Sequence, residues 1–220
     1  MAQWDLGRFV QTLDYFESIP VVSWLQTMIQ PRPRPQVDLS IAENRKILFD
    51  FTQPIDIKNT WGALDDVVMG GVSNSAIYPG NGVAVFSGRV STENSGGFAS
   101  VRTRNFDPAI ALSDYTGIEL HLKGDGNRYK FLLRDDDSWD SIGFSHSFDT
   151  IANDWITVQI PFSTLIPVFR AKTVSGRSLN SSAVRSLQLM LSKFEYDGAL
   201  NPHFNSGEFR LEIRQIAAYR

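Results

Sequence analysis

The spacing of apolar residues changes once along the chain, from a helical period to a period of two. Near the N-terminus, apolar residues recur three or four positions apart in two groups, Leu6–Phe16 and Val21–Ile29, which Pro20 separates. This spacing predicts two short amphipathic helices. Prolines then alternate with arginines over positions 31–35, a pattern that favours a stiff, extended linker. We therefore expect a domain boundary near Pro35.

Beyond the linker, apolar and polar residues alternate in short runs, which is the period of a β-strand. Nine such runs lie between turn-forming residues, at 47–52, 82–91, 98–104, 117–123, 129–134, 141–148, 155–160, 184–193 and 208–219. No helical pattern lies between them. We therefore expect an all-β fold, an antiparallel β-sandwich over residues 36–220, with residues 1–35 as a short N-terminal helical appendage.

Two of these patterns predict particular strand geometry. The runs 117–123 and 129–134 flank a turn-forming segment, 124–127, and together predict a β-hairpin. In the last run, 208–219, the apolar residues change phase, which predicts a bulge near Arg214. Long loops are expected at 59–81, 134–140 and 161–182, and loops of that length in a compact β domain are often functional.

Composition and charge narrow the functional classes. The chain has 220 residues, of which 42% are hydrophobic and 20% charged, so it can bury a sizeable core. Its net charge of −3 provides no basic excess, and no nucleic acid partner is expected. The absence of cysteine removes disulfides, thiolate metal ligands and cysteine nucleophiles. No secretory signal pattern or membrane-spanning apolar run is found, so we expect an intracellular protein, either cytoplasmic or peripheral on an internal membrane.

The segment Trp61–Ser73 is the densest unusual motif in the chain. It contains adjacent carboxylates at Asp65 and Asp66 and adjacent glycines at positions 70 and 71. Neighbouring side chains of an extended chain point to opposite sides, so the two aspartates are not expected to form an acid–base pair. In a turn, either could accept hydrogen bonds from backbone N–H groups. Three interpretations stay open: a structured loop, a partner-binding surface, and an enzyme that uses Asp65 or Asp66.

This segment resembles the signature of the complex I intermediate-associated protein 30 family, in which a Trp precedes Asp-Asp, a hydrophobic pair, Met-Gly-Gly and Ser. Segments 49–51, 96–103 and 117–134 are similar to other parts of the family pattern, and the resemblance covers roughly residues 47–220. The opening segment Trp4–Glu17 resembles a cyanobacterial or plastid-type member. The resemblance implies a galactose-binding-like jelly roll. Because the best-known mitochondrial member is an assembly chaperone for respiratory complex I, it also implies a non-enzymatic assembly factor.

On this resemblance, the segments 61–73 and 96–102 are expected to form one surface that binds a protein subunit of a respiratory or photosynthetic membrane complex. The residues expected to contribute are Trp61, Asp65, Asp66, Val67, Val68, Met69, Gly70, Gly71, Ser73, Gly97, Phe98 and Arg102. No catalytic residue, cofactor or metal ligand is expected, since His121, His146 and His203 are scattered and no nucleophile motif is present.

A carbohydrate-binding module of galactose-binding-like fold is the alternative. Trp139 could stack on a sugar, and the acidic loop Asp135–Asp140 could hold a structural calcium ion, although its spacing is not that of an EF-hand. A solvated loop is the simpler interpretation of these carboxylates. The helical segment 4–29 could pack on its own domain, dock to a partner or contact a membrane peripherally, and its polar face is poor in Lys and Arg.

Overall fold

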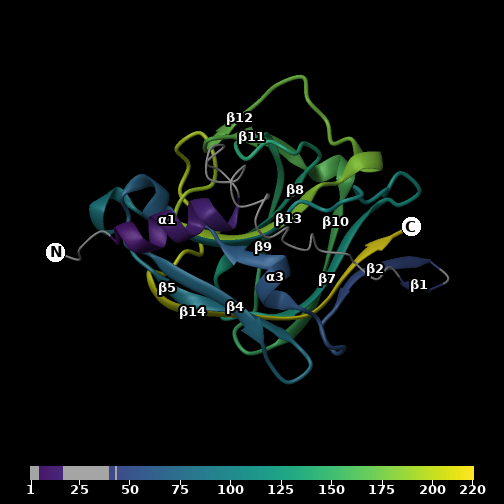
Figure 1. The fold of residues 1–220 in the computed structure, drawn as a ribbon, viewed down its shortest axis with the longest axis horizontal. Coiled ribbons are helices and arrows are strands. Elements are labelled where there is room, and N and C mark those ends of the chain that lie inside the picture. Colours follow the sequence, from purple (N-terminus) through teal and green to yellow (C-terminus); the bar gives the residue numbers. More distant parts are fainter. Residues whose placement is uncertain (1–4, 17–39, 43) are drawn as a thin grey trace, which may run out of the picture.

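The computed structural model describes residues 5–16, 40–42 and 44–220. Among them, two antiparallel β-sheets pack face to face, and helix α1 (Leu6–Tyr15) lies against one end of the sandwich (Figure 1). The helix predicted at 21–29, the proline-rich linker and the domain boundary near Pro35 lie outside the described residues.

The first sheet is built around one long strand, β14 (Gly207–Tyr219). On one edge of β14, β5 (Ala84–Val90) pairs with its first half and β2 (Arg45–Asp50) with its second half. On the other edge, β7 (Gly117–Lys123) pairs with residues 212–219. Three more described strands extend this sheet: β1 (Ser40–Ala42) beside β2, β4 (Asn74–Pro79) beside β5, and β10 (Trp155–Pro161) beside β7.

The second sheet has the order β12-β11-β9-β8-β13-β6-β3 within the described residues. Its strands are β12 (Lys172–Thr173), β11 (Ile166–Phe169), β9 (Gly143–Asp149), β8 (Arg128–Arg134), β13 (Ser186–Ser192), β6 (Phe98–Thr103) and β3 (Trp61–Ala63). The short helical turns between strands are α3 (Ile57–Thr60), η1 (Asp66–Met69), η2 (Glu93–Ser95), η3 (Phe162–Thr164) and η4 (Ser181–Ala183).

Strand alternation decides which side chains enter the core. In β8, Tyr129, Phe131 and Leu133 point between the sheets and are completely buried, because successive side chains of a strand point to opposite faces. Lys130 and Arg134 therefore lie on the opposite surface, which we call the outer face of the second sheet. One continuous apolar cluster fills the space between the two sheets.

Each of the nine predicted runs overlaps a strand, and the all-β sandwich is confirmed. The predicted bulge is also confirmed, because the pairing of β14 with β7 shifts register between Ile213 and Gln215. The segments predicted as long loops contain further strands: β3 and β4 lie within 59–81, and β11 and β12 lie within 161–182.

The predicted hairpin of 117–123 with 129–134 is wrong. β7 belongs to the first sheet and pairs with β10 and β14, whereas β8 belongs to the second sheet and pairs with β9 and β13. The segment between them crosses from one sheet to the other. Asp125 fixes this crossing by accepting hydrogen bonds from the Tyr129 hydroxyl at 2.9 Å and the Arg210 amide at 2.9 Å. β7 and β8 therefore lie in opposite sheets, on either side of the core.

Helix α1 packs on the sandwich through the side that carries Arg8, Thr12 and Tyr15. Gly62 lies beneath the Tyr15 ring, since a Cβ at that position would stand 2.3 Å from a ring carbon. The apolar residues Leu6 and Val10 are instead 58% and 49% exposed. The helix therefore presents part of its apolar side outward. No helix in the described part of the chain is long and apolar enough to span a membrane.

Candidate functional site

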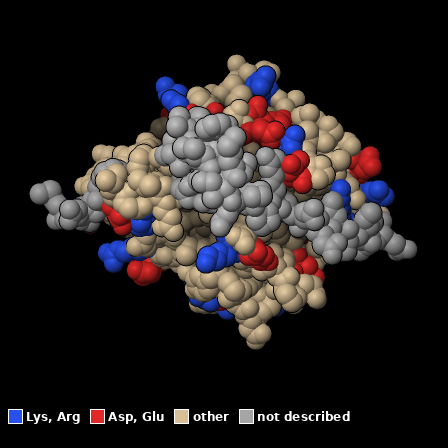
Figure 2. Space-filling model, viewed as in Figure 1, with Lys and Arg blue, Asp and Glu red and all other residues tan. Residues whose placement is uncertain are grey.

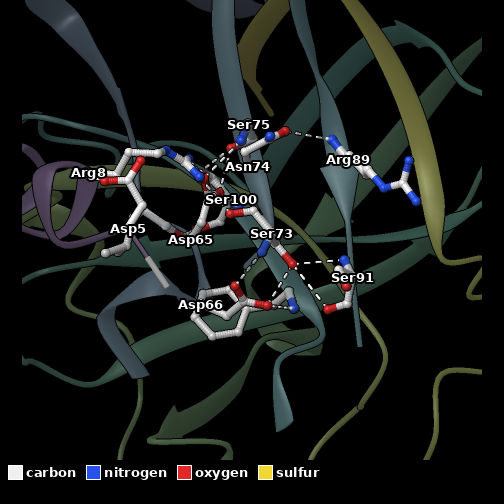
Figure 3. Close-up of polar contacts among 12 residues, drawn as sticks. Asp5, Arg8, Asp65, Asp66, Ser73, Asn74, Ser75, Arg89, Ser91 and Ser100 are labelled. Carbon is white, nitrogen blue, oxygen red and sulfur yellow. Dashed lines mark hydrogen bonds and ion pairs between the residues drawn. The ribbon is translucent and has the colours of Figure 1, made fainter. Parts of the chain in front are cut away.

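Asp65 is buried at the start of η1 and accepts four hydrogen bonds from three separate elements (Figure 3). The donors are the Ser75 amide at 2.9 Å, the Ser75 hydroxyl at 2.6 Å, the Ser100 amide at 3.0 Å and Arg8 Nη2 at 2.7 Å. Burial raises the pKa of Asp65, while the Ser75 hydroxyl, the Ser100 amide and the Arg8 guanidinium act in the opposite direction. Asp65 thus joins α1, β4 and β6.

Asp66 is equally buried and connects a different set of segments. One carboxylate oxygen accepts the Ser73 amide at 2.9 Å. The other accepts the Ser73 hydroxyl at 2.6 Å, the Gly97 amide at 2.7 Å and the Phe98 amide at 3.2 Å. The loop 66–73 is therefore tied to the loop that precedes β6.

Glycines make room for the Asp66 carboxylate. A Cβ at Gly71 would lie 2.3 Å from Asp66 Cγ, and a Cβ at Gly96 would lie 2.5 Å from Asp66 Oδ2. Gly70 adopts a left-handed conformation with φ of 89°, which ends η1 and favours glycine. The paired glycines of the motif therefore serve the close packing and the turn around this carboxylate.

The two aspartates therefore act as structural acceptors. They accept hydrogen bonds from different donors, as neighbouring side chains that point to opposite sides are expected to do. Each is 1% exposed and its lone pairs are taken up by donors. An acid–base role would require a carboxylate that reaches a substrate, and neither carboxylate does so in this arrangement.

The structure brings the segments 61–73 and 96–102 together but buries most of their predicted partner-binding side chains. Buried residues are Trp61, Asp65, Asp66, Val67, Gly71, Ser73, Gly97 and Arg102. Trp61 packs against Phe49 in the core, with ring centroids 5.4 Å apart. Val68, Gly70 and Phe98 are partly exposed, and Met69 is 77% exposed.

The accessible surface includes residues that sequence reasoning did not assign to it. Helix α1, which carries the exposed Leu6 and Val10, packs against η1, which carries Met69. We call Leu6, Val10, Val68, Met69 and Phe98 together the Met69 surface. Helical spacing identified Leu6 and Val10 as apolar, but it could not show that they face away from the sandwich.

Arg102, which was expected to contribute to the same surface as the two aspartates, is buried beside Phe16 and Trp139. Its side chain lies on the outer face of the second sheet, where Nη1 donates to the Trp139 carbonyl at 3.0 Å. The guanidinium lies 5.9 Å from the centre of the Phe16 ring and 5.7 Å from that of the Trp139 ring, and these two rings pack on each other. Trp139, which could have been free to stack on a sugar, is therefore engaged by Phe16 and Arg102.

The carboxylates of the acidic loop are each engaged locally. Asp135 accepts the Asn180 amide and Asp136 the Ser138 amide, both at 2.7 Å. Asp137 pairs with Arg185, and Asp140 pairs with Arg170. The described residues contain no group of three or more His, Cys, Asp or Glu side chains placed to hold a metal ion. The arrangement thus agrees with a solvated loop.

The surface charge on the viewed face is mixed. Basic and acidic side chains of the described residues are interspersed in Figure 2 rather than separated by sign. A broad basic surface, which binding to a nucleic acid backbone requires, is not seen among the described residues on that face.

Residues 49–213 match the family model of complex I intermediate-associated protein 30. No curated protein matches the chain significantly. The matched range includes the Trp61–Ser73 motif, both aspartates and the loop that Asp66 joins to it.

Solved structures share the fold at low sequence identity. A family 11 carbohydrate-binding module of a cellulosomal cellulase from Clostridium thermocellum is similar with a TM-score of 0.58 and 18% identity, covering 81% of this chain and 96% of that one. A family 11 carbohydrate-binding module from Clostridium thermocellum in complex with a β-1,3-1,4-mixed-linked tetrasaccharide has a TM-score of 0.56 at 20% identity, covering 81% of this chain and 97% of that one. An agarase has a TM-score of 0.54 at 8% identity, covering 81% and 25%. The fold is therefore the galactose-binding-like jelly roll that the resemblance implied.

Proposed function

Because the chain belongs to the complex I intermediate-associated protein 30 family, we propose that it is an assembly factor that binds a protein subunit of a respiratory or photosynthetic membrane complex through the Met69 surface. The family description associates its members with complex I intermediates. The identity of the client as a respiratory or photosynthetic subunit, and the residues that contact it, are parts of this proposal.

The exposure of Met69 is the observation that carries the proposal. A methionine that is 77% exposed sits next to a helix whose Leu6 and Val10 are also exposed. Apolar residues that gather on one surface are typical of protein interaction sites, and methionine adapts its shape to different partners. The partly exposed Val68 and Phe98 extend the same surface.

The buried aspartates give this surface a fixed shape. Asp66 holds the loop that carries Met69 against the loop that carries Phe98. The ion pair between Arg8 and Asp65, at 2.7 Å, holds α1 beside η1. A surface that is ordered before binding loses less conformational entropy when a partner docks. We therefore assign the buried carboxylates of the motif to support of this surface, and the contact with the partner to the exposed apolar residues.

Purification of the tagged chain from its own cells tests the proposal. We expect subunits of a respiratory or photosynthetic complex to co-purify, and we expect Met69→Glu to reduce their yield by about tenfold or more, since a charge placed in an apolar contact must be desolvated. Ile151→Glu is the matched control, because Ile151 is 58% exposed and lies between β9 and β10. Failure to recover such subunits, or an equal loss in both variants, would contradict the proposal.

Carbohydrate binding is the second candidate function, and the fold likeness to carbohydrate-binding modules is what favours it. A glycan array that includes mixed-linked β-glucans, probed with and without calcium, tests it directly. Binding at micromolar strength that Trp139→Ala removes would favour this function over subunit binding. Peripheral membrane contact through residues 4–29 is a separate proposal, which vesicle co-sedimentation of the wild-type chain and of a Leu6→Glu variant tests.

A further inference from the structure

The outer face of the second sheet carries basic side chains that the proposed function does not use. In strand register, Arg102 of β6 lies opposite Gln188 of β13, and Arg134 of β8 lies opposite Ser186 of β13. All four side chains lie on this outer face because the residues between them enter the core. Arg102 and Arg134 therefore flank the same short stretch of β13.

These two guanidiniums have only neutral acceptors among the described residues. Arg102 is 3% exposed and donates to Ser186 Oγ at 3.3 Å and to the Trp139 carbonyl at 3.0 Å, with Asn105 Oδ1 at 3.5 Å from its third nitrogen. Arg134 Nη1 donates to Gln188 Oε1 at 2.7 Å. Arg134 Nε is buried and has no hydrogen-bond partner.

At the other end of β8, the basic side chains of this outer face are paired with carboxylates. Arg128, also in β8, forms ion pairs with Asp149 at 2.7 Å and with Glu195 at 2.8 Å. The Lys130 ammonium lies 3.9 Å from a carboxylate oxygen of Glu195. Basic residues on this face are therefore matched with carboxylates at one end and unmatched at the other.

Two acidic side chains of the loop 135–140 are paired with other arginines. Asp137 pairs with Arg185, and Asp140 pairs with Arg170. Burial lowers the pKa of Arg134 to about 10, and the opposing effects of Tyr196 and Asp140, which raise it, are smaller. Burial, followed by the charge of Arg134, lowers the pKa of Arg102 to about 9. Both groups stay protonated at neutral pH, so two positive charges face each other with little compensation.

Unpaired buried charges are costly, and a ligand that supplies the opposite charge removes that cost. The guanidinium fork matches the two oxygens of a carboxylate, and the free Nε of Arg134 is one donor of such a fork. The rings of Phe16 and Trp139 hold the Arg102 guanidinium in place. We propose that Arg102 and Arg134 form a binding site for a carboxylate, supplied either by an acidic peptide or by a free dicarboxylic acid. This site is separate from the Met69 surface.

The Nε–H resonance of Arg134 provides a direct readout in ¹H–¹⁵N NMR spectra of the full chain, and its absence from the Arg134→Gln spectrum assigns it. We would titrate succinate against succinamide, and the peptide acetyl-Gly-Glu-Gly-Glu-Gly-amide against its Gln counterpart. We expect a saturable shift with the acidic member of at least one pair and none with its neutral counterpart. Arg102→Gln and Arg134→Lys should each weaken binding by about tenfold or more, as loss of a charged bidentate contact would. Binding to Arg134→Lys, which lacks the Arg134 resonance, is followed through the Nε–H resonance of Arg102.

Arg89→Gln is the matched control, because Arg89 is an arginine of the first sheet whose side chain is 67% exposed, and this variant should bind as the wild type does. Tighter binding of the peptide than of succinate identifies a polypeptide as the source of the carboxylate, and the reverse identifies a small acid. The proposal is overturned if neither acidic probe gives a saturable shift, if the neutral probes shift the resonance equally, or if inorganic phosphate binds more tightly than both. An equal loss in Arg89→Gln would overturn it as well. Arg134→Lys keeps the charge, so it reports on the site even if Arg102→Gln fails to fold.

Discussion

Replacing Asp66 by Asn tests whether this buried carboxylate holds the motif together. In the native protein, one oxygen accepts the Ser73 amide, and the other accepts the Ser73 hydroxyl and the Gly97 and Phe98 amides. Asparagine keeps one acceptor oxygen and replaces the other by an NH₂ group, which is itself a donor. With its oxygen turned toward the three donors, it leaves the Ser73 amide facing a donor, and the opposite orientation leaves more donors unpaired.

The expected loss in free energy of unfolding follows from the burial of Asp66 and from the strength of hydrogen bonds to a carboxylate. A hydrogen bond to a charged acceptor contributes about 1.5–3 kcal/mol, and a buried donor left without a partner costs about 1–3 kcal/mol. Asp66 is 1% exposed, so water cannot replace the lost acceptor. We therefore expect the free energy of unfolding to fall by about 2–4 kcal/mol. For a domain of this size, that lowers the melting temperature by roughly 4–16 °C.

Urea denaturation followed by tryptophan fluorescence and circular dichroism measures this change. Asp136→Asn is the control, because Asp136 is an exposed aspartate that accepts one backbone amide, from Ser138 at 2.7 Å. We expect the control to stay within about 0.5 kcal/mol of the wild type. If Asp66→Asn also stays within that range, the carboxylate does not hold the loop, and the Met69 surface is not fixed in shape by Asp66.

Three further predictions concern other parts of the structure. Gly71→Ala should destabilise the protein by about 2 kcal/mol or more in the same urea assay, since its Cβ would lie 2.3 Å from Asp66 Cγ, whereas Gly82→Ala meets no atom within 4 Å and should show only the smaller cost of its positive φ, about 1 kcal/mol. Burial lowers the pKa of Lys130 to about 8 from the ordinary 10.5, so between these values the folded state binds fewer protons than the unfolded state, and the free energy of unfolding should rise with pH. Lys130→Met should remove the rise between about pH 8 and 9, below the lowered pKa values of Arg102 and Arg134. Arg8→Ala should speed hydrogen exchange of the backbone amides in α1, measured by mass spectrometry, and an exchange rate unchanged from the wild type would show that the ion pair to the aspartate does not hold the helix.

The sequence predicts the sandwich well because alternation marks strands with one buried face. It fails for strands of two to four residues such as β3, β11 and β12, which are too short to show a period. The alternation of apolar and polar residues also does not predict which strands pair with each other. Residues 117–123 and 129–134 have the alternation of a hairpin, but alternation states which side is buried and not which strand lies alongside.

The candidate site was predictable only in part for a similar reason. Adjacency alone indicates that Asp65 and Asp66 point to opposite sides, and the glycines indicate a close approach. The donors to Asp66 at Gly97 and Phe98 are more than thirty positions away, so nothing local identifies them. The sequence also did not show which side of α1 faces the sandwich. The partly buried ion pair of Arg8 turns a polar side of the helix toward the sandwich and leaves Leu6 exposed.

The position of β14 has a consequence for how the protein is made. β14 follows the other described strands in the chain, yet it is the strand on which β2, β5 and β7 all pair. During synthesis these three strands leave the ribosome with one edge unpaired, and exposed strand edges favour aggregation. Pairing between strands so distant in sequence is also slow. We therefore expect the nascent chain to depend on protection by chaperones until β14 emerges and the first sheet can close.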